Sequence, residues 1–275
     1  MLELLNDIDF PRNIRATDMN SHLILCAGAK SSASTWLFNV VAEIMRAREA
    51  AEMSSYIRPE TPESHRGEIV RQFYADSPEV FPVFDSVSDL LVIQTQRPSS
   101  ALCTYAIDMN APIVMTIREP RDSIASLMKR FGYNFASAFR AVTEGDARVL
   151  QLFRRGRPLV LRFEDRFYER EATIAAVAGF LHVDLPAQLV HQIHSALTRD
   201  EVRRKIETLQ ESGAFGGAAD RESHDPQTRW RPGHVGDITI GQHAEFLSHD
   251  EQLQVLQATA GYCAQFGYPT EPTDI

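Results

Sequence analysis

The chain has 275 residues, of which 44% are hydrophobic, so it is long enough to bury a substantial core as one α/β domain. Its 37 acidic and 28 basic side chains give a net charge of -9, which argues against general nucleic-acid binding and requires any anionic ligand to find a local basic pocket. No apolar run approaches the roughly 20 residues that span a bilayer, and the acidic amino terminus is unlike a signal peptide, so we expect a cytoplasmic protein without a membrane span.

After an amino-terminal extension of residues 1–20, a hydrophobic strand (22–27), a loop of small residues and a helix are predicted in succession. The first loop, residues 28–35, offers backbone amides that can crowd round an anion, hydroxyls at the helix start and one mobile positive charge. Its candidate anion ligands are Lys30, Ser31, Ser32, Ala33, Ser34 and Thr35. It lacks the Walker A order of glycine, four residues, glycine, lysine and serine or threonine, which makes a magnesium-dependent NTPase the weaker interpretation.

Residues 54–88 have no strong periodicity and are interrupted by prolines, which predicts a substrate loop over the strand ends. Within this loop His65 is our candidate for a catalytic base, because its unperturbed pKa is near neutrality. Glu60, Glu63 and Asp85 are alternatives, and each of these side chains is equally explained as a solvated group on a surface loop. A strand at 89–95 follows.

A third strand, the apolar segment 113–117, places Arg118 at its carboxyl end, where open α/β sheets bind their ligands. Asp122 is predicted to cap the helix that follows. Ser126 and Arg130 share the polar face of this helix and can meet a ligand, and an arginine offers a fixed fork of donors suited to phosphate or sulfate oxygens. Taken alone, a capped amphipathic helix with surface arginines explains the segment equally well.

The carboxyl half is predicted to be mostly helical after a last strand at 158–163, with helices at 169–181, 188–210 and 250–266. Residues 211–241 are rich in glycine and proline, which predicts a cofactor-covering loop or, alternatively, a disordered connector. Strands that alternate with helices predict an α/β, P-loop-like three-layer fold with a central parallel sheet flanked by helices, in one domain over 1–275. Three widely spaced cysteines and scattered histidines predict neither a disulfide framework nor a metal site.

Four segments in order resemble the cytosolic-type sulfotransferases that use 3'-phosphoadenosine-5'-phosphosulfate (PAPS), as a bacterial-like member of that family. Ser32 to Trp36 resembles the second half of the family loop proline, lysine, serine, glycine, threonine, threonine, tryptophan. Arg118 to Ser126 matches the signature arginine, any residue, proline, arginine, aspartate, three residues, serine at every fixed position. Leu159 to Asp165 and Arg231 to Asp237 resemble two later family segments, and the resemblance runs from about residue 23 to 269.

The resemblance implies PAPS as the donor, adenosine 3',5'-bisphosphate (PAP) as the product, and a hydroxyl or amine of a small molecule or sugar as the acceptor. It implies that the first loop holds the 5'-phosphosulfate and that Trp36 stacks on adenine. It further implies that the 3'-phosphate is held by Arg118, Ser126, Arg231 and Gly233, and that Pro232 belongs to the same cofactor-binding segment. No metal is required, and the oligomeric state stays open.

Two departures from the family pattern affect the mechanism. Aligned without a gap, Lys30 falls on the family proline and Ser31 on the family lysine; we expect Lys30 to stabilise the leaving phosphate. Gln96 stands where the family carries the histidine that takes the acceptor's proton, and glutamine cannot act as a base at neutral pH. A small-molecule kinase with an atypical phosphate loop and a catalytically impaired nucleotide-binding protein of the same fold are therefore the alternatives.

Overall fold

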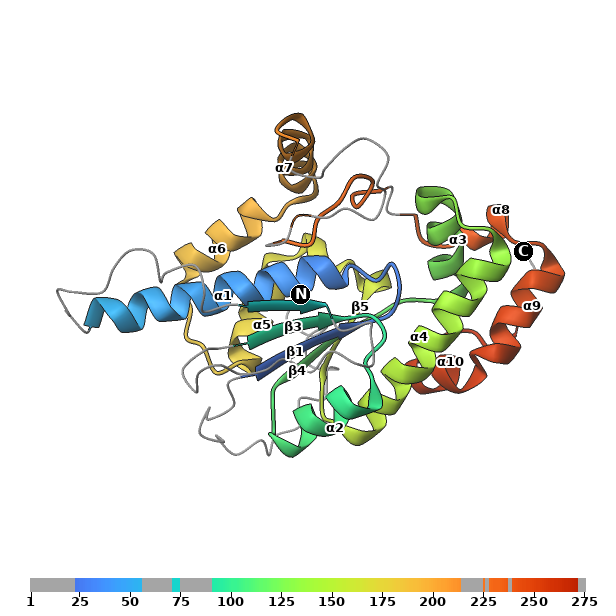
Figure 1. Cartoon of the computed structure of the whole chain (residues 1–275), viewed down its shortest axis with the longest axis horizontal. Coiled ribbons are helices and arrows are strands. Elements are labelled where there is room, and N and C mark those ends of the chain that lie inside the picture. Colours follow the sequence, from blue (N-terminus) through green and yellow to red (C-terminus); the bar gives the residue numbers. More distant parts are fainter. Residues whose placement is uncertain are drawn as a thin grey trace.

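A computed structural model describes residues 23–55, 71–74, 91–213, 225, 228–236 and 239–271 (Figure 1). In chain order its elements are β1 Leu23–Gly28, α1 Ser34–Ser55, β2 Arg71–Tyr74, β3 Leu91–Thr95, α2 Ser100–Asp108, β4 Ile113–Ile117, α3 Pro120–Phe131, α4 Phe135–Arg155, β5 Leu159–Arg162, the short 3-10 turns η3 Phe163–Asp165 and η4 Phe167–Glu169, α5 Glu171–Phe180, α6 Ala187–Ala196, α7 Arg199–Glu211, α8 His243–Phe246, α9 His249–Ala258 and α10 Ala260–Phe266.

The centre of the fold is a five-stranded sheet in the order β2-β3-β1-β4-β5, in which every neighbouring pair is parallel. β1 lies in the middle, and its Leu25 is in register with Ile93 of β3 and Ile113 of β4. Parallel strands align their carboxyl ends along one edge, so the residues that follow β1, β3 and β4 come together there. The predicted α/β fold with a central parallel sheet is confirmed.

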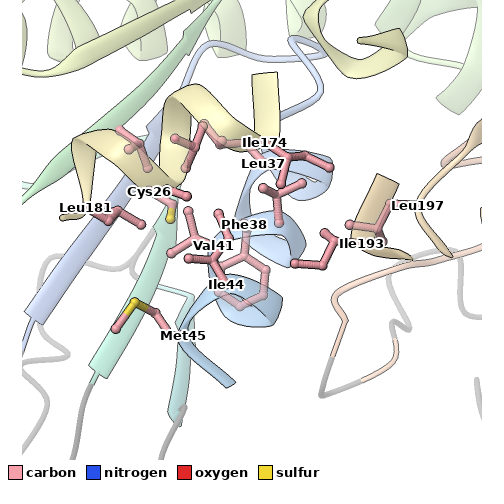
Figure 2. Close-up of a cluster of buried hydrophobic side chains, with 14 of the residues drawn as sticks. Cys26, Leu37, Phe38, Val41, Ile44, Met45, Ile174, Leu181, Ile193 and Leu197 are labelled. Carbon is pink, nitrogen blue, oxygen red and sulfur yellow. The ribbon is translucent and has the colours of Figure 1, made fainter. Parts of the chain in front are cut away.

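The side chains of β1 alternate between two cores, because successive residues of a strand point to opposite faces. Ile24 and Cys26 pack beneath α1, α5 and α6, whereas Leu25 and Ala27 pack against α2, α4 and α10. Figure 2 shows the first of these cores, where Phe38 and Ile44 of α1 lie among side chains of α5 and α6. Burial of each such side chain stabilises the fold by roughly 1.5–3 kcal/mol. The result is a three-layer arrangement with helices on both faces of the sheet (Figure 1).

Several predicted boundaries were wrong. The segment 54–88, predicted as a loop, contributes its first two residues to α1 and Arg71–Tyr74 to an edge strand of the sheet, which is too short for an alternating pattern to reveal. The helix predicted over 188–210 is two helices, because Thr198 takes an extended conformation between α6 and α7. The last helix is likewise divided at Thr259 into α9 and α10.

Candidate functional site

A cavity of about 700 Å³ opens at the carboxyl ends of β1, β3 and β4. Its wall includes residues of the first loop, the ends of β3 and β4, α3, α6, α7 and the late segment, which we define as residues 228–236. This is the edge at which parallel α/β sheets bind their ligands. None of the described helices is long and apolar enough to cross a membrane.

The first loop passes unusually close to β4. A Cβ added to Gly28 would lie 2.4 Å from Oγ1 of Thr116 and 2.6 Å from Cβ of Ser34, so only glycine fits. Ser31 and Ala33 then take positive φ angles of 56° and 63°. Where left-handed and right-handed residues alternate, successive backbone N–H groups can form a concavity that binds anions. The loop predicted from its small residues therefore includes two left-handed positions, a feature found in backbone anion sites.

Lys30 extends from this loop to the end of β3. Its Nζ donates a hydrogen bond to Oε1 of Gln96 at 2.9 Å, and Nε2 of Gln96 donates to Oγ of Ser34 at 3.0 Å. Lys30, Gln96 and Ser34 all line the cavity. The two residues that depart from the family pattern are thus in direct contact, and the amide of Gln96 orients the ammonium group of Lys30.

A second chain of polar contacts joins β3 to the late segment. Nε2 of Gln94 donates to Oγ1 of Thr35 at 2.9 Å, and this hydroxyl lies 3.3 Å from Nε2 of His234. Burial, together with the charges of Arg130 and Arg231, lowers the pKa of His234 to about 3, so the imidazole is neutral at physiological pH. Gln94 and His234 were not predicted as site residues. Gln94 and Gln96 stand two residues apart at a strand end, and this spacing is a signal that could have identified them together.

Arg118, at the end of β4, is buried and ties three parts of the site together. Its Nη1 donates to the carbonyl of Ser31 at 2.9 Å, and its Nη2 donates to the carbonyl of Thr239 at 3.2 Å. The guanidinium also stacks on the ring of Phe163, with Cζ 4.0 Å from the ring centroid. Burial lowers the pKa of Arg118, an effect that the charges of Asp122 and Glu164 partly oppose. Its pKa is so high in water that it nevertheless keeps its charge.

Asp122 does not cap α3, contrary to the sequence prediction. The helix begins earlier, at Pro120, and Glu119 caps it by accepting a hydrogen bond from the backbone N–H of Asp122. Asp122 instead accepts hydrogen bonds from the backbone N–H groups of Gly241 and His243, at 2.7 and 3.0 Å. Burial raises the pKa of this carboxyl, but hydrogen bonds from His243 and Gly241 and the charge of Arg118 lower it by more. Asp122 therefore fastens the chain after the late segment to α3.

Arg130 and Arg231 bring two more guanidinium groups to the cavity wall. Nη2 of Arg130 donates to the carbonyl of Gly233 at 2.9 Å, and Arg231 stacks on Phe131 with Cζ 4.2 Å from the ring centroid. Burial and the charges of Arg118 and Arg231 lower the pKa of Arg130 to about 10. Three guanidinium groups therefore repel one another across one cavity, which is the electrostatic condition of a site for a polyanion.

Trp36 lies on the wall near the start of α1, where its orientation is fixed by two contacts. Its indole Nε1 donates to the carbonyl of Leu197 at 2.9 Å, and Phe167 packs edge-on against its ring. The side chain is also part of the cavity wall, where a planar group can stack on an indole.

The structure brings most of the predicted site residues to one wall. Those that line the cavity are Lys30, Ser31, Ala33, Ser34, Thr35, Trp36, Arg118 and Arg231. Those that do not are Ser32, Ser126, Pro232 and Gly233. Ser126 is buried within α3 at 2% exposure, and Oγ of Ser32 is bonded to the carbonyl of Ala29 and to Thr116. His65 lies outside the described residues, so its role as a base stays a prediction.

One group of possible metal-ligating atoms lies in the described part of the chain. Atoms of Glu119, Asp122 and His243 lie within 4.8 Å of one another. Each of these side chains already has a partner, since Nδ1 of His243 lies 2.7 Å from Asp122 and Glu119 pairs with Nε of Arg121 at 2.7 Å. We therefore assign this group to the attachment of α3 and not to a metal.

Comparison with protein-family models found no match, and comparison with curated proteins found no significant match. Solved structures do match. Retinol dehydratase in complex with androsterone and the inactive cofactor PAP is similar with a TM-score of 0.56 and 17% identity, over 88% of this chain and 80% of that chain. Retinol dehydratase with retinol and PAP gives 0.56 and 16%, over 88% and 81%. Mouse sulfotransferase SULT7A1 complexed with PAP gives 0.54 and 11%, over 88% and 84%.

Proposed function

We propose, from the fold that this chain shares with PAP-bound sulfotransferases, that it moves a sulfuryl group from PAPS to a hydroxyl or amine of a small molecule or sugar. The observation that carries the proposal is the charge of the cavity wall. Among the described residues seven basic side chains line it, against one acidic side chain, Glu169, in a chain whose net charge is -9. The basic residues are Lys30, Arg97, Arg118, Arg130, Arg199, Arg229 and Arg231.

The residues present fit this donor. The backbone of the first loop, whose close approach to β4 requires glycine at position 28, suits the 5'-phosphosulfate. The guanidinium groups of Arg118 and Arg231 suit the 3'-phosphate, and the fixed indole of Trp36 suits adenine. Bound PAPS would supply the sulfuryl group and leave as PAP.

The chain's own part in the reaction is to hold the donor and to stabilise charge. Lys30 is held at the end of β3 by Gln96 and can donate to the oxygen on which negative charge develops as the bond to the leaving phosphate breaks. Gln96 itself cannot take the acceptor's proton. His234 is a weak base at its pKa of about 3, so we keep His65 as the proposed proton acceptor.

The test has two steps. Isothermal calorimetry should show that PAP binds more tightly than ATP and that Mg²⁺ does not change the affinity. Transfer of radiolabelled sulfate from PAPS to a panel of alcohols, phenols, amines and sugars should then give a labelled product. Preference for ATP with Mg²⁺ would instead indicate the kinase alternative. That alternative is disfavoured because kinases hold Mg²⁺ with acidic side chains, and the described wall residues include a single one, Glu169.

Tight binding of PAP without transfer to any acceptor would indicate a nucleotide-binding protein that has lost catalysis. The feature that favours this second candidate is Gln96, which stands at the end of β3 where a base is expected. We propose a cytoplasmic location and a small-molecule or carbohydrate acceptor as part of the same hypothesis.

A further inference from the structure

We infer that Arg130 is a third anion-binding arginine of this cavity, and that Arg118, Arg130 and Arg231 together hold a phosphate monoester in its dianionic form. This inference rests on the proposed function, because it takes the bound phosphate monoester to be the 3'-phosphate of PAPS. Arg130 lies one turn after Ser126 on α3 and lines the cavity, whereas Ser126 does not.

The described part of the chain places too few carboxylates beside these three arginines to balance their charge. Among the described residues no carboxylate forms an ion pair with Arg130 or Arg231, and Arg118 has one, Asp122, at 3.9 Å. Two other carboxylates raise the pKa of Arg118, but Glu119 is paired with Arg121 at 2.7 Å and Glu164 with Arg162 at 3.4 Å. Among the described residues, one carboxylate, that of Asp122, therefore offsets the positive charges of the three arginines.

Burying unpaired charge is costly, so an excess of two positive charges in a cavity indicates a counter-ion of the opposite charge. A phosphate monoester carries close to two negative charges near neutral pH and accepts hydrogen bonds from several donors at once. A phosphodiester carries one negative charge and leaves one guanidinium uncompensated. The excess of two positive charges at Arg118, Arg130 and Arg231 thus matches a monoester.

Arg130 also contacts the late segment, and this contact offers a purely structural explanation that the experiment must separate. Its Nε and Nη2 donate to the carbonyl of Gly233 at 3.2 and 2.9 Å, and Nη2 also donates to the carbonyl of His234. A Cβ on Gly236 would lie 2.7 Å from Cδ and Nε of Arg130, so the late segment packs directly against this side chain. A residue that only supported the late segment would affect every ligand of the cavity alike.

The experiment compares two nucleotides that differ by the 3'-phosphate alone, PAP and adenosine 5'-monophosphate. Their affinities are measured by calorimetry at low ionic strength for the unmodified protein, Arg130→Met and Arg130→Lys. Lys129→Met, which changes the exposed neighbouring charge on α3, is the matched control. We expect Arg130→Met to weaken PAP by about 10-fold to 100-fold, the effect of one charge-assisted hydrogen-bonding group. Adenosine 5'-monophosphate should bind nearly as before.

Arg130→Lys should give an intermediate loss for PAP, because it keeps the charge without the planar fork. Lys129→Met should change neither affinity. Equal weakening of both nucleotides by Arg130→Met, or no weakening of PAP, would overturn the inference in favour of a structural role.

Inorganic phosphate provides a readout that does not depend on the proposed function. Phosphate should raise the melting temperature of the unmodified protein and raise that of Arg130→Met much less. If PAP does not bind but this difference is observed, the proposed function fails and the anion site stands. If phosphate stabilises both proteins equally or neither of them, the anion site is refuted even where PAP binds.

Discussion

Replacing Gly28 by alanine should damage both the stability of the fold and the binding of the donor. The added Cβ would meet Oγ1 of Thr116 at 2.4 Å and Cβ of Ser34 at 2.6 Å, about 1 Å closer than ordinary contact. Neither neighbour can easily move, because Thr116 is buried and its hydroxyl lies 2.6 Å from that of Ser32, and Ser34 begins α1. Overpacking of this kind costs roughly 1–3 kcal/mol.

The strain can be relieved if the first loop moves away from β4, which would shift the backbone N–H groups that we propose bind the anion. We therefore expect the free energy of unfolding in urea to fall by about 1–3 kcal/mol. We expect the affinity for PAP to fall by at least about tenfold, since one lost hydrogen bond to a charged group has that effect.

Gly179→Ala is the matched control. Gly179 lies in α5, and a Cβ there would have no neighbour within 4 Å. Alanine is the better helix former, so this variant should be about 0.5–1 kcal/mol more stable and should bind PAP unchanged. If Gly28→Ala matched the control in both stability and affinity, our explanation of the first loop would be wrong.

Three further predictions concern single side chains. Arg118→Met should weaken PAP by about 10-fold to 100-fold in calorimetry, because it removes a charged donor group from the anion site; unchanged affinity would contradict the site. Lys30→Met should lower the turnover of sulfate transfer by about 100-fold or more while PAP affinity changes less, because Lys30 acts on charge that develops during transfer; equal losses in both would assign Lys30 to binding alone. The free energy of unfolding should fall as the pH decreases from about 6.5 toward about 3, because the unfolded chain protonates His234 before the folded protein does. The His234 contribution to this slope is at most about 1.4 kcal/mol per pH unit, and urea titrations of His234→Gln should lack it; identical slopes in the two proteins would refute the low pKa.

Local patterns predicted the elements that place the site. The buried strand before Arg118 and the strand, loop and helix around Lys30 are each contiguous in sequence. The structure has both strands and the start of the helix within one or two residues of the expected positions. Such segments are predictable because a buried strand reads as an uninterrupted apolar run and a loop of small residues stands out beside it.

Contacts between distant segments could not be predicted in this way. Lys30 is 66 residues from Gln96, and Arg130 is 104 residues from His234, so no periodicity connects them. Asp122 has the residue type of a helix cap and stands at a helix start, yet a neighbouring glutamate took the cap and left the aspartate to a segment 119 residues away. Local preference is a weak guide where a tertiary hydrogen bond competes for the same side chain.

The chain has two tryptophans, Trp36 and Trp230, and both lie on the wall of the cavity. Trp36 belongs to α1 and Trp230 to the late segment, so the two rings line the cavity from separate elements. The tryptophan fluorescence of the protein therefore originates beside the place where a nucleotide would bind. Binding of a ligand in the cavity should therefore change the intensity or wavelength of tryptophan emission, and this can be measured without a dye and without knowing the acceptor.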